Sequence, residues 1–294
     1  MYLPVTTPFA SGTGDLDREA FEANLRAWTS EGVDGLVVAG STGEAPLLDE
    51  IEILRLTEWA REVAPEGVEV VTGTGCESTR STVRLTRLAA EAGAGAVLVR
   101  PPAYYAGAME EAAVSTHYRT LADASPIPVI LYHIPKYVPV PLDPEVVGRL
   151  VEHENIVGIK DSSGDVHNLG ALVDVCSGRA AVMVGAGTLL YGGLEVGAAG
   201  GVVAVGLLAT AACAEIVSAW REGDTGRAGA LQERVGPLHR SVVARQGVPG
   251  VKFGLDLLGL HGGPPRPPLL PADESSRQAV HGALTAAGLQ PVSA

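Results

Sequence analysis

The sequence has few aromatic residues and no paired cysteines. Phenylalanine, tryptophan and tyrosine make up 4% of the 294 residues, whereas hydrophobic residues as a whole make up 46%. This composition fits close packing of helices on a sheet better than an aromatic-rich β-sandwich. The cysteines, Cys76, Cys176 and Cys213, are odd in number, far apart and without a CxxC pair. We therefore expect reduced thiols and a cytoplasmic protein.

Positive charge is also scarce. Lysine and arginine total 21 against 34 acidic residues, for a net charge of -13, and the arginines are scattered along the chain. Because nucleic-acid binding needs a basic patch, no nucleic-acid partner is expected. The Walker P-loop and the GxGxxG, HExxH and GxSxG motifs are all missing. The sequence therefore predicts neither a metal nor an organic cofactor.

A membrane segment is not expected either. Residues 196–214 carry no charge and are long enough to count as a candidate span. Their Gly200-Gly201 step, the β-branched cluster at 202–205 and the flanking Glu195 and Glu215 instead predict a buried strand followed by a helix. The N-terminus lacks a basic stretch followed by a long apolar one, so no signal peptide is predicted.

The sequence does contain a regular alternation of short apolar runs and amphipathic runs. Asp17 and the capping-box pattern from Asp49 to Glu52 predict helix starts, and Gly93 predicts a helix end. Strands that each precede a helix form a parallel sheet. The leading fold is therefore α/β, a (β/α)8 TIM barrel, with an open doubly wound sheet as the alternative. The predicted strands are residues 2–6, 35–38, 68–72, 96–99, 128–132, 156–160, 181–184 and 201–205.

The pattern becomes helical only beyond about residue 225. Residues 227–245, 249–259 and 273–287 predict three helices, separated by Gly247-Val248-Pro249 and by a proline-rich stretch at 262–271. We predict a catalytic barrel at residues 1–225 and a C-terminal helical region at 226–294 packed on it.

One lysine stands out against the composition. The chain has three lysines, Lys136, Lys160 and Lys252, and eighteen arginines, and Lys160 ends a strand that reads as buried. A desolvated lysine can lose its proton and attack a carbonyl carbon, such as that of a 2-oxo acid, to form an imine. The alternative is that Lys160 extends into solvent or pairs with Asp161.

Other polar groups follow neighbouring strands. Active sites of such barrels lie at the C-terminal ends of the strands. Hydroxyl groups could bind a carboxylate there and a phenol could move protons, although a solvated turn and a core tyrosine are the alternatives. These strand ends carry Gly40-Ser41-Thr42-Gly43-Glu44, Tyr104-Tyr105, Tyr132, Lys160 and Gly185-Ala186-Gly187.

These motifs resemble the dihydrodipicolinate synthase and N-acetylneuraminate lyase family of pyruvate-dependent class I aldolases. The resemblance spans nearly the whole chain and rests on three motifs in the same order: Gly40-Ser41-Thr42-Gly43-Glu44, Tyr132-His133-Ile134-Pro135 and Gly158-Ile159-Lys160-Asp161-Ser162. It implies a (β/α)8 barrel with a C-terminal helical region. It further implies a covalent lysine imine with pyruvate, no cofactor, and a homotetramer built as a dimer of dimers.

The resemblance also implies roles for individual residues. Lys160 would form the Schiff base, and Tyr132 would be the proton shuttle. Ser41 would be a relay hydroxyl, and Tyr104 would complete the relay from a neighbouring subunit. Three further positions match those that bind the substrate in this family: Thr42, Ser162 and Gly185.

Within the family, the closest resemblance is to 4-hydroxy-2-oxoglutarate aldolase, through residues 73–79, 125–128 and 160–166. The predicted reaction is therefore reversible cleavage of a 4-hydroxy-2-oxo acid to pyruvate and an aldehyde. Tyr137 stands where the synthases usually carry an arginine, and His133 replaces the usual asparagine. Lys136 and His133 could bind an anionic or hydroxylated substrate tail; the alternative is that Lys136 is solvated. The alternatives are 4-hydroxy-tetrahydrodipicolinate synthesis, processing of a 2-oxo-3-deoxy sugar acid, and a non-catalytic barrel that binds an oxo acid.

Overall fold

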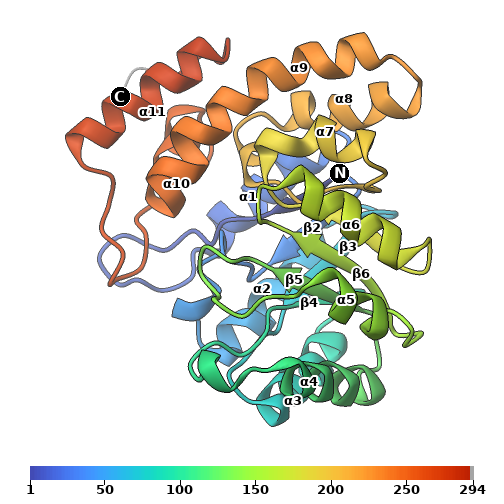
Figure 1. The fold of residues 1–294 in the computed structure, drawn as a ribbon. Helices are drawn as coiled ribbons and strands as arrows, with labels where there is room; N and C mark the ends of the chain where they lie inside the picture. Colours follow the sequence, from blue (N-terminus) through green and yellow to red (C-terminus); the bar gives the residue numbers. More distant parts are fainter. Residues whose placement is uncertain (292–294) are drawn as a thin grey trace.

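The computed structural model describes residues 1–291 and consists of eight strands, each followed by a helix (Figure 1). The last three positions of the predicted C-terminal region, 292–294, lie outside the described residues. The strands are β1 (Tyr2–Pro4), β2 (Gly35–Val38), β3 (Glu69–Gly73), β4 (Ala96–Val99), β5 (Val129–His133), β6 (Ile156–Asp161), β7 (Ala181–Val184) and β8 (Gly200–Gly201). The α-helices are α1 (Arg18–Thr29), α2 (Glu50–Val63), α3 (Thr79–Glu91), α4 (Glu111–Ala124), α5 (Pro144–Leu150), α6 (Val166–Cys176), α7 (Leu190–Glu195), α8 (Thr210–Arg221), α9 (Thr225–Leu238), α10 (Arg245–Leu257) and α11 (Glu274–Ala286).

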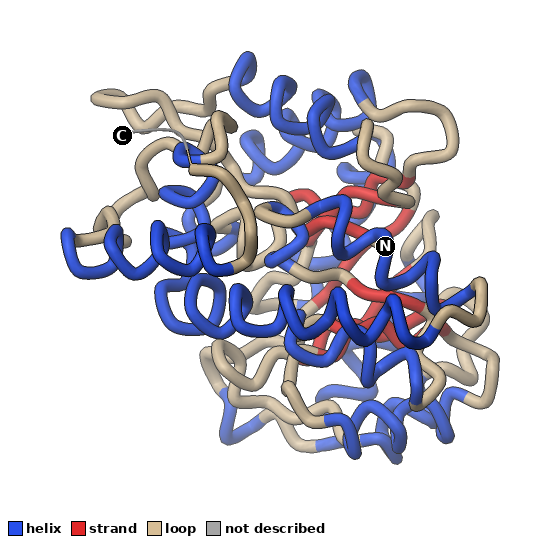
Figure 2. Tube along the Cα trace, turned by 90° about the horizontal axis from the view of Figure 1, so that it is seen from above, coloured by secondary structure: helices blue, strands red, loops and turns tan. Residues whose placement is uncertain are grey.

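The strands form a closed barrel. Every neighbouring pair from β1 to β8 is parallel, and a parallel bridge between Tyr2 and Val202 joins the last strand to the first. Seen from above, the strands lie together at the centre and the helices surround them (Figure 2). The (β/α)8 barrel predicted from the alternating pattern is confirmed.

The helices pack on the barrel through the faces that their sequence predicts. In α1, Phe21, Leu25 and Trp28 are all buried. Asp17 caps this helix by accepting from the backbone N–H of Ala20, and the capping box from Asp49 to Glu52 is formed at α2. These local signals place the helices correctly because a cap is a short-range interaction that needs no distant partner.

The eighth strand differs from its prediction. The β-branched run at 202–205 predicts a strand, but β8 spans only Gly200–Gly201 and a 3-10 turn, Ala204–Leu207, follows. These residues are buried all the same, because the turn packs against β1 and α8. Within residues 1–291 no helix is both long enough and apolar enough to cross a bilayer.

Helices α9, α10 and α11 lie together on one side of the barrel (Figure 1). The single helix predicted at 227–245 is α9 followed by a π-helical segment, His239–Ala244. It then runs into α10, where Gly247 adopts φ 63° and ψ -153° and bends the chain. Pro249, which cannot donate a backbone hydrogen bond, follows this bend.

Candidate active site

Tyr132 and Lys160 lie next to each other at the C-terminal end of the barrel. They are register partners on β5 and β6, which points both side chains to the same face of the sheet. The Lys160 Nζ lies 4.4 Å from the centroid of the Tyr132 ring. The pairing of an amine with a phenol therefore follows directly from the strand register.

Lys160 is buried, with 3% of its surface exposed. The neighbouring carboxylate of Asp161 is occupied elsewhere: it accepts from Ser163 Oγ at 2.6 Å and Asn168 Nδ2 at 3.2 Å, and it contacts His133 Nδ1 at 2.6 Å. Neither alternative from the sequence, extension into solvent or pairing with Asp161, describes this lysine. Its amine is held out of water without a carboxylate partner among the described residues.

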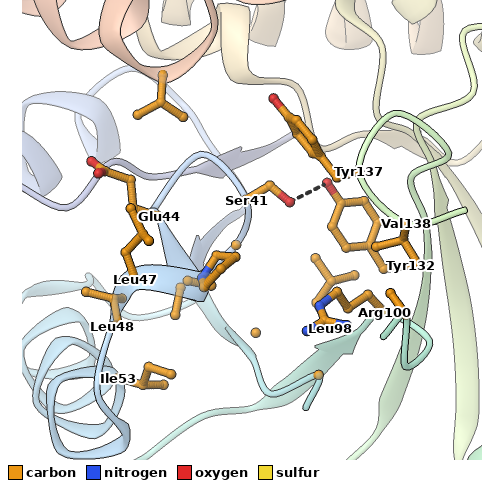
Figure 3. Close-up of a pocket in the computed structure, with 18 of the residues that line it drawn as sticks. Ser41, Glu44, Leu47, Leu48, Ile53, Leu98, Arg100, Tyr132, Tyr137 and Val138 are labelled. Atoms are coloured by element: carbon orange, nitrogen blue, oxygen red, sulfur yellow. Dashed lines mark hydrogen bonds between the residues drawn. The ribbon is translucent and has the colours of Figure 1, made fainter. Parts of the chain in front are cut away.

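Ser41 reaches the same site from the end of β2. Its hydroxyl lies 3.4 Å from the Tyr132 hydroxyl, and Figure 3 shows this hydrogen bond in the wall of a cavity. The turn that carries Ser41 closes on itself, because the N–H of Ala45 donates to the carbonyl of Gly40. Thr7 Oγ1 also donates to the carbonyl of Gly43 at 2.7 Å. The chain thus presents the Ser41 hydroxyl to the phenol on a braced turn.

Ser162 and Gly185 meet at the rim beside Lys160. A Cβ atom built on Gly185 would lie 2.0 Å from Ser162 Oγ, so only glycine allows this approach. The Ser162 N–H donates to the carbonyl of His133, and the Gly185 N–H donates to that of Asp161. The two positions predicted to line the substrate site are therefore adjacent.

Thr42 and Tyr104 are the other two predicted site residues. Thr42 follows Ser41 on the same turn and is partly exposed. Tyr104 is 80% exposed and stacks edge-on against Tyr105 on the loop after β4. Glu77 holds this loop by accepting from the backbone N–H groups of Ala103 and Tyr104.

The Ser41–Tyr132 pair opens into a cavity of about 1000 Å³. Most of its wall is apolar, and its charged groups are largely paired: Arg84 with Glu50, and Arg100 with Glu77. The cavity is much larger than a three-carbon oxo acid, and Ser41 and Tyr132 are the predicted site residues in its wall. Its apolar wall includes Leu47, Leu48, Ile53, Leu98 and Val138 (Figure 3).

Lys136 and Tyr137 line the mouth of this cavity on the loop after β5. The Lys136 Nζ donates to the carbonyl of Ala244 at 3.1 Å and lies 5.4 Å from the Tyr137 ring. His133, the other candidate for a substrate tail, turns its Nδ1 toward Asp161 instead. Lys136 is thus the better placed of the two to meet an anionic group.

Sequence reasoning missed two features of the site. The first is the role of Asp161 as a hub for His133, Ser163 and Asn168. The second is a buried ion pair in which Lys252 Nζ donates to Glu44 Oε1 at 2.6 Å. The scarcity of lysine was a usable signal for Lys252, since the composition otherwise favours arginine. No group of three or more His, Cys, Asp or Glu in residues 1–291 is arranged to hold a metal ion.

Comparison with known proteins identifies relatives along nearly the whole chain. The model of the dihydrodipicolinate synthetase family matches residues 1–287. A 4-hydroxy-tetrahydrodipicolinate synthase of Rhodopseudomonas palustris is 35% identical over 98% of this chain and 96% of its own. One from Synechococcus is 37% identical over 96% and 93%. These relatives are named synthases, so the closer resemblance to 4-hydroxy-2-oxoglutarate aldolase has no support among them.

Solved structures agree with this similarity. A dihydrodipicolinate synthase from Acinetobacter baumannii, complexed with pyruvate, superposes with a TM-score of 0.93 at 30% identity over 98% of both chains. A prophage protein of the dihydrodipicolinic acid synthase family from E. coli K12, also in complex with pyruvate, superposes with a TM-score of 0.91 at 28% identity over 98% of both chains.

Proposed function

The chain belongs to the dihydrodipicolinate synthetase family of pyruvate-dependent class I aldolases, and from that premise we propose that it joins pyruvate to an aldehyde through an imine on Lys160. The observation that carries this proposal is the buried Lys160 amine beside Tyr132, with Ser41 Oγ 3.4 Å from the Tyr132 hydroxyl. An amine, a phenol and a second hydroxyl in sequence can perform every proton transfer that the reaction needs.

The proposed steps follow from these groups. The neutral amine of Lys160 adds to the carbonyl carbon of pyruvate, and loss of water leaves an imine. Protonation of the imine nitrogen draws electrons from the methyl group. Tyr132, which has given its proton to the departing water, accepts a proton from this methyl group, and an enamine results. The enamine carbon attacks the aldehyde carbon, and Tyr132 supplies the proton that the new alkoxide needs. Hydrolysis, or displacement by another amine, releases the product and returns Lys160.

We propose 4-hydroxy-tetrahydrodipicolinate synthesis as the first candidate reaction. The two relatives described above carry this name, and their alignments cover 96 to 98% of this chain and 93 to 96% of the relatives' own length. The second reactant would then be aspartate semialdehyde, and the cavity beyond Tyr132 offers room for it. Lys136, at the mouth, supplies a positive charge for its carboxylate.

The second candidate is the reversible cleavage of a 4-hydroxy-2-oxo acid such as 4-hydroxy-2-oxoglutarate. Tyr137 favours it, because this position carries an arginine in the usual synthase pattern, whereas here a half-exposed phenol lines the cavity. Without that guanidinium the site makes fewer charged contacts with a semialdehyde. A 2-oxo-3-deoxy sugar acid would use the same amine.

Borohydride reduction tests the imine. Pyruvate and borohydride together should add a permanent adduct to the peptide that contains Lys160, and the Lys160→Ala variant should show neither adduct nor turnover. The three lysines make the peptide map simple to read. An adduct on Lys136 or Lys252 alone would contradict the proposal. Absence of any adduct and any turnover would instead favour a non-catalytic barrel that binds an oxo acid.

Parallel assays separate the candidates. Pyruvate is supplied with aspartate semialdehyde, with glyoxylate or with a short sugar aldehyde, and the condensation rates are compared at equal concentrations. A rate at least about tenfold higher with the semialdehyde supports the synthase, since tenfold corresponds to about 1.4 kcal/mol of transition-state discrimination. The reverse ranking supports the aldolase.

The proposal includes a homotetramer, in which Tyr104 completes the proton relay of a neighbouring subunit. Its support is that Tyr104 and Tyr105 form an exposed aromatic pair on a braced loop. A cytoplasmic location is also part of the proposal, because all three cysteines are free.

A further inference from the structure

A buried ion pair joins the C-terminal helices to the turn that carries Ser41. The Lys252 side chain from α10 and the Glu44 side chain at the end of the turn are both almost fully buried, at 1% and 0% exposed. Lys252 Nζ donates to Glu44 Oε1 at 2.6 Å and to the carbonyl of Pro264 at 2.9 Å. Burial lowers the pKa of Lys252, against the opposing effect of the Glu44 carboxylate. The positive charge of the buried Lys252 ammonium is therefore compensated by the carboxylate of Glu44.

Glu44 needs this anchor because its backbone is strained. It adopts φ 60° and ψ 31°, the left-handed region that residues with a Cβ atom seldom occupy. Its N–H donates to the carbonyl of Ser41 at 3.3 Å, so the strained residue and Ser41 belong to one hydrogen-bonded turn. In Figure 3 the Glu44 carboxylate points away from the Ser41 hydroxyl. Glu44 thus fixes the turn from behind, leaving the hydroxyl free to face Tyr132.

A second contact from the same region holds the other carboxylate oxygen. The backbone N–H of Arg266 donates to Glu44 Oε2 at 2.8 Å. The Arg266 guanidinium makes a two-pronged pair with Glu52 and also donates to the carbonyl of Leu47, which locks the proline-rich segment against α2. Both oxygens of Glu44 are therefore bound by residues more than 200 positions later in the chain.

The local packing explains why lysine stands at 252. Its ammonium lies 4.5 Å from the Phe9 ring as well as against Glu44 and Pro264, so a compact charge with three donors fits three neighbours. A Cβ atom built on Gly262 would lie 1.8 Å from the carbonyl oxygen of Lys252, so the returning chain packs directly on the lysine backbone.

We propose that Lys252 is a positioning residue for the reaction: through Glu44 it holds the turn that presents the Ser41 hydroxyl to Tyr132. The inference rests on the proposed function, because it assigns Ser41 a part in proton transfer. It gives the C-terminal helices a role in the reaction although none of them supplies a reacting group. It also assigns a role to the glutamate that ends the Gly40-to-Glu44 motif.

The test is a double-mutant cycle between Lys252→Met and Ser41→Ala. Methionine keeps the length of the side chain and removes its charge, which leaves Glu44 buried and unpaired. We expect Lys252→Met to lower kcat/KM by about tenfold or more in the wild-type background, and by less than about threefold when Ser41 is already alanine. Such non-additivity appears only if Lys252 acts through Ser41. Equal losses in both backgrounds would overturn the proposal.

A stability control separates positioning from simple destabilisation. Val280→Ala removes buried volume from α11 without touching the turn, so it should lower Tm while leaving kcat/KM within about twofold. Glu44→Gln is the second test variant and should reproduce the non-additivity. If Lys252→Met does not fold, Glu44→Gln takes its place in the cycle and is assayed at low temperature. If either charge variant is fully folded by circular dichroism and keeps wild-type activity, the inference is wrong.

The outcome is distinguishable from failure of the proposed function. Borohydride trapping of pyruvate by the wild-type protein tests Lys160 without reference to Lys252. If trapping succeeds and the cycle is additive, only the positioning role is wrong. If the wild-type protein does not trap pyruvate, the proposed function itself is wrong.

Discussion

At the scale of single residues, Tyr132 contacts both of the other groups that take part in the proposed proton transfers. Its ring lies beside Lys160 and its hydroxyl beside Ser41, so it is the only link between the amine and the second hydroxyl in the described site. The phenol is also nearly buried. A proton that moves from the carbinolamine toward the cavity therefore has a short route through this hydroxyl.

Removing only the hydroxyl tests that route. Tyr132→Phe should lower kcat by about 10²- to 10⁴-fold, the range expected for a lost general acid–base group. The ring remains, so the fold and Tm should change little. Steady-state kinetics with pyruvate and the preferred aldehyde measure the effect. A loss below about threefold would show that another group transfers the proton.

His117 sets a pH limit on stability. It is buried on α4, where its Nδ1 contacts Thr79 Oγ1 at 2.9 Å, and burial, with a smaller effect from Arg100, lowers its pKa to about 4. In the unfolded chain His117 binds a proton below about pH 6.5, whereas in the folded protein it binds one only below about pH 4. Stability therefore falls as the pH drops through this window, by about 3 kcal/mol in total for one such group.

The His117→Gln variant should flatten this dependence. Between pH 7.5 and 5, its free energy of unfolding should fall by about 2 kcal/mol less than that of the wild-type protein, because glutamine does not titrate. Urea unfolding at the two pH values measures the difference. His239 has its pKa lowered to about 4 in the same direction, so the double variant should flatten the curve further. Identical slopes in wild-type and variant proteins would refute the assignment.

At the scale of elements, the ends of β2 and β3 are packed backbone to backbone below the Ser41 turn. A Cβ atom built on Gly73, the last residue of β3, would lie 2.0 Å from the carbonyl oxygen of Ala39. Ala39 itself has a φ of 51° and leads directly into Gly40 and Ser41. The geometry of this turn thus depends on a residue of the next strand.

Gly73→Ala should disturb both stability and the site. The added methyl group has no space, so we expect a loss of about 1 to 3 kcal/mol in the free energy of unfolding, together with a lower kcat. Gly95→Ala is the matched control, since its nearest neighbour would be at 3.8 Å, an ordinary contact. Chemical denaturation and steady-state kinetics report the two effects. Equal behaviour of the two variants would contradict the packing argument.

At the scale of the whole molecule, the exposed aromatic pair is the feature that a single chain does not explain. Tyr104 and Tyr105 stand on a loop that is held rigidly by Glu77, whose carboxylate accepts two backbone N–H groups. Desolvation opposes ionisation of Glu77, but these hydrogen bonds and Arg100 outweigh it and lower its pKa. An ordered, solvent-facing tyrosine pair is typical of an interaction surface.

Light scattering coupled to size exclusion tests the assembly. The wild-type protein should elute with about four times the mass of one chain. Tyr104→Ala with Tyr105→Ala removes the aromatic pair and should shift the population toward smaller species, because aromatic anchors contribute strongly to interfaces. A wild-type protein that stays monomeric at assay concentration would refute both the tetramer and the shared relay.

The sequence by itself determined the architecture and pointed to Lys160 as the reacting group that we propose. Apolar runs alternating with amphipathic helices specify a parallel barrel, and caps such as Asp17 and Asp49 act over a few residues, so local patterns suffice to place them. Lys160 was noticed in the sequence because lysine is scarce in this chain and this lysine ends an apolar run. Only the tertiary structure decided how the site is supported. Glu44 meets Lys252 across 208 positions, and Asp161 turns to His133 rather than to Lys160, because long-range pairing depends on how the closed barrel and the C-terminal helices pack together.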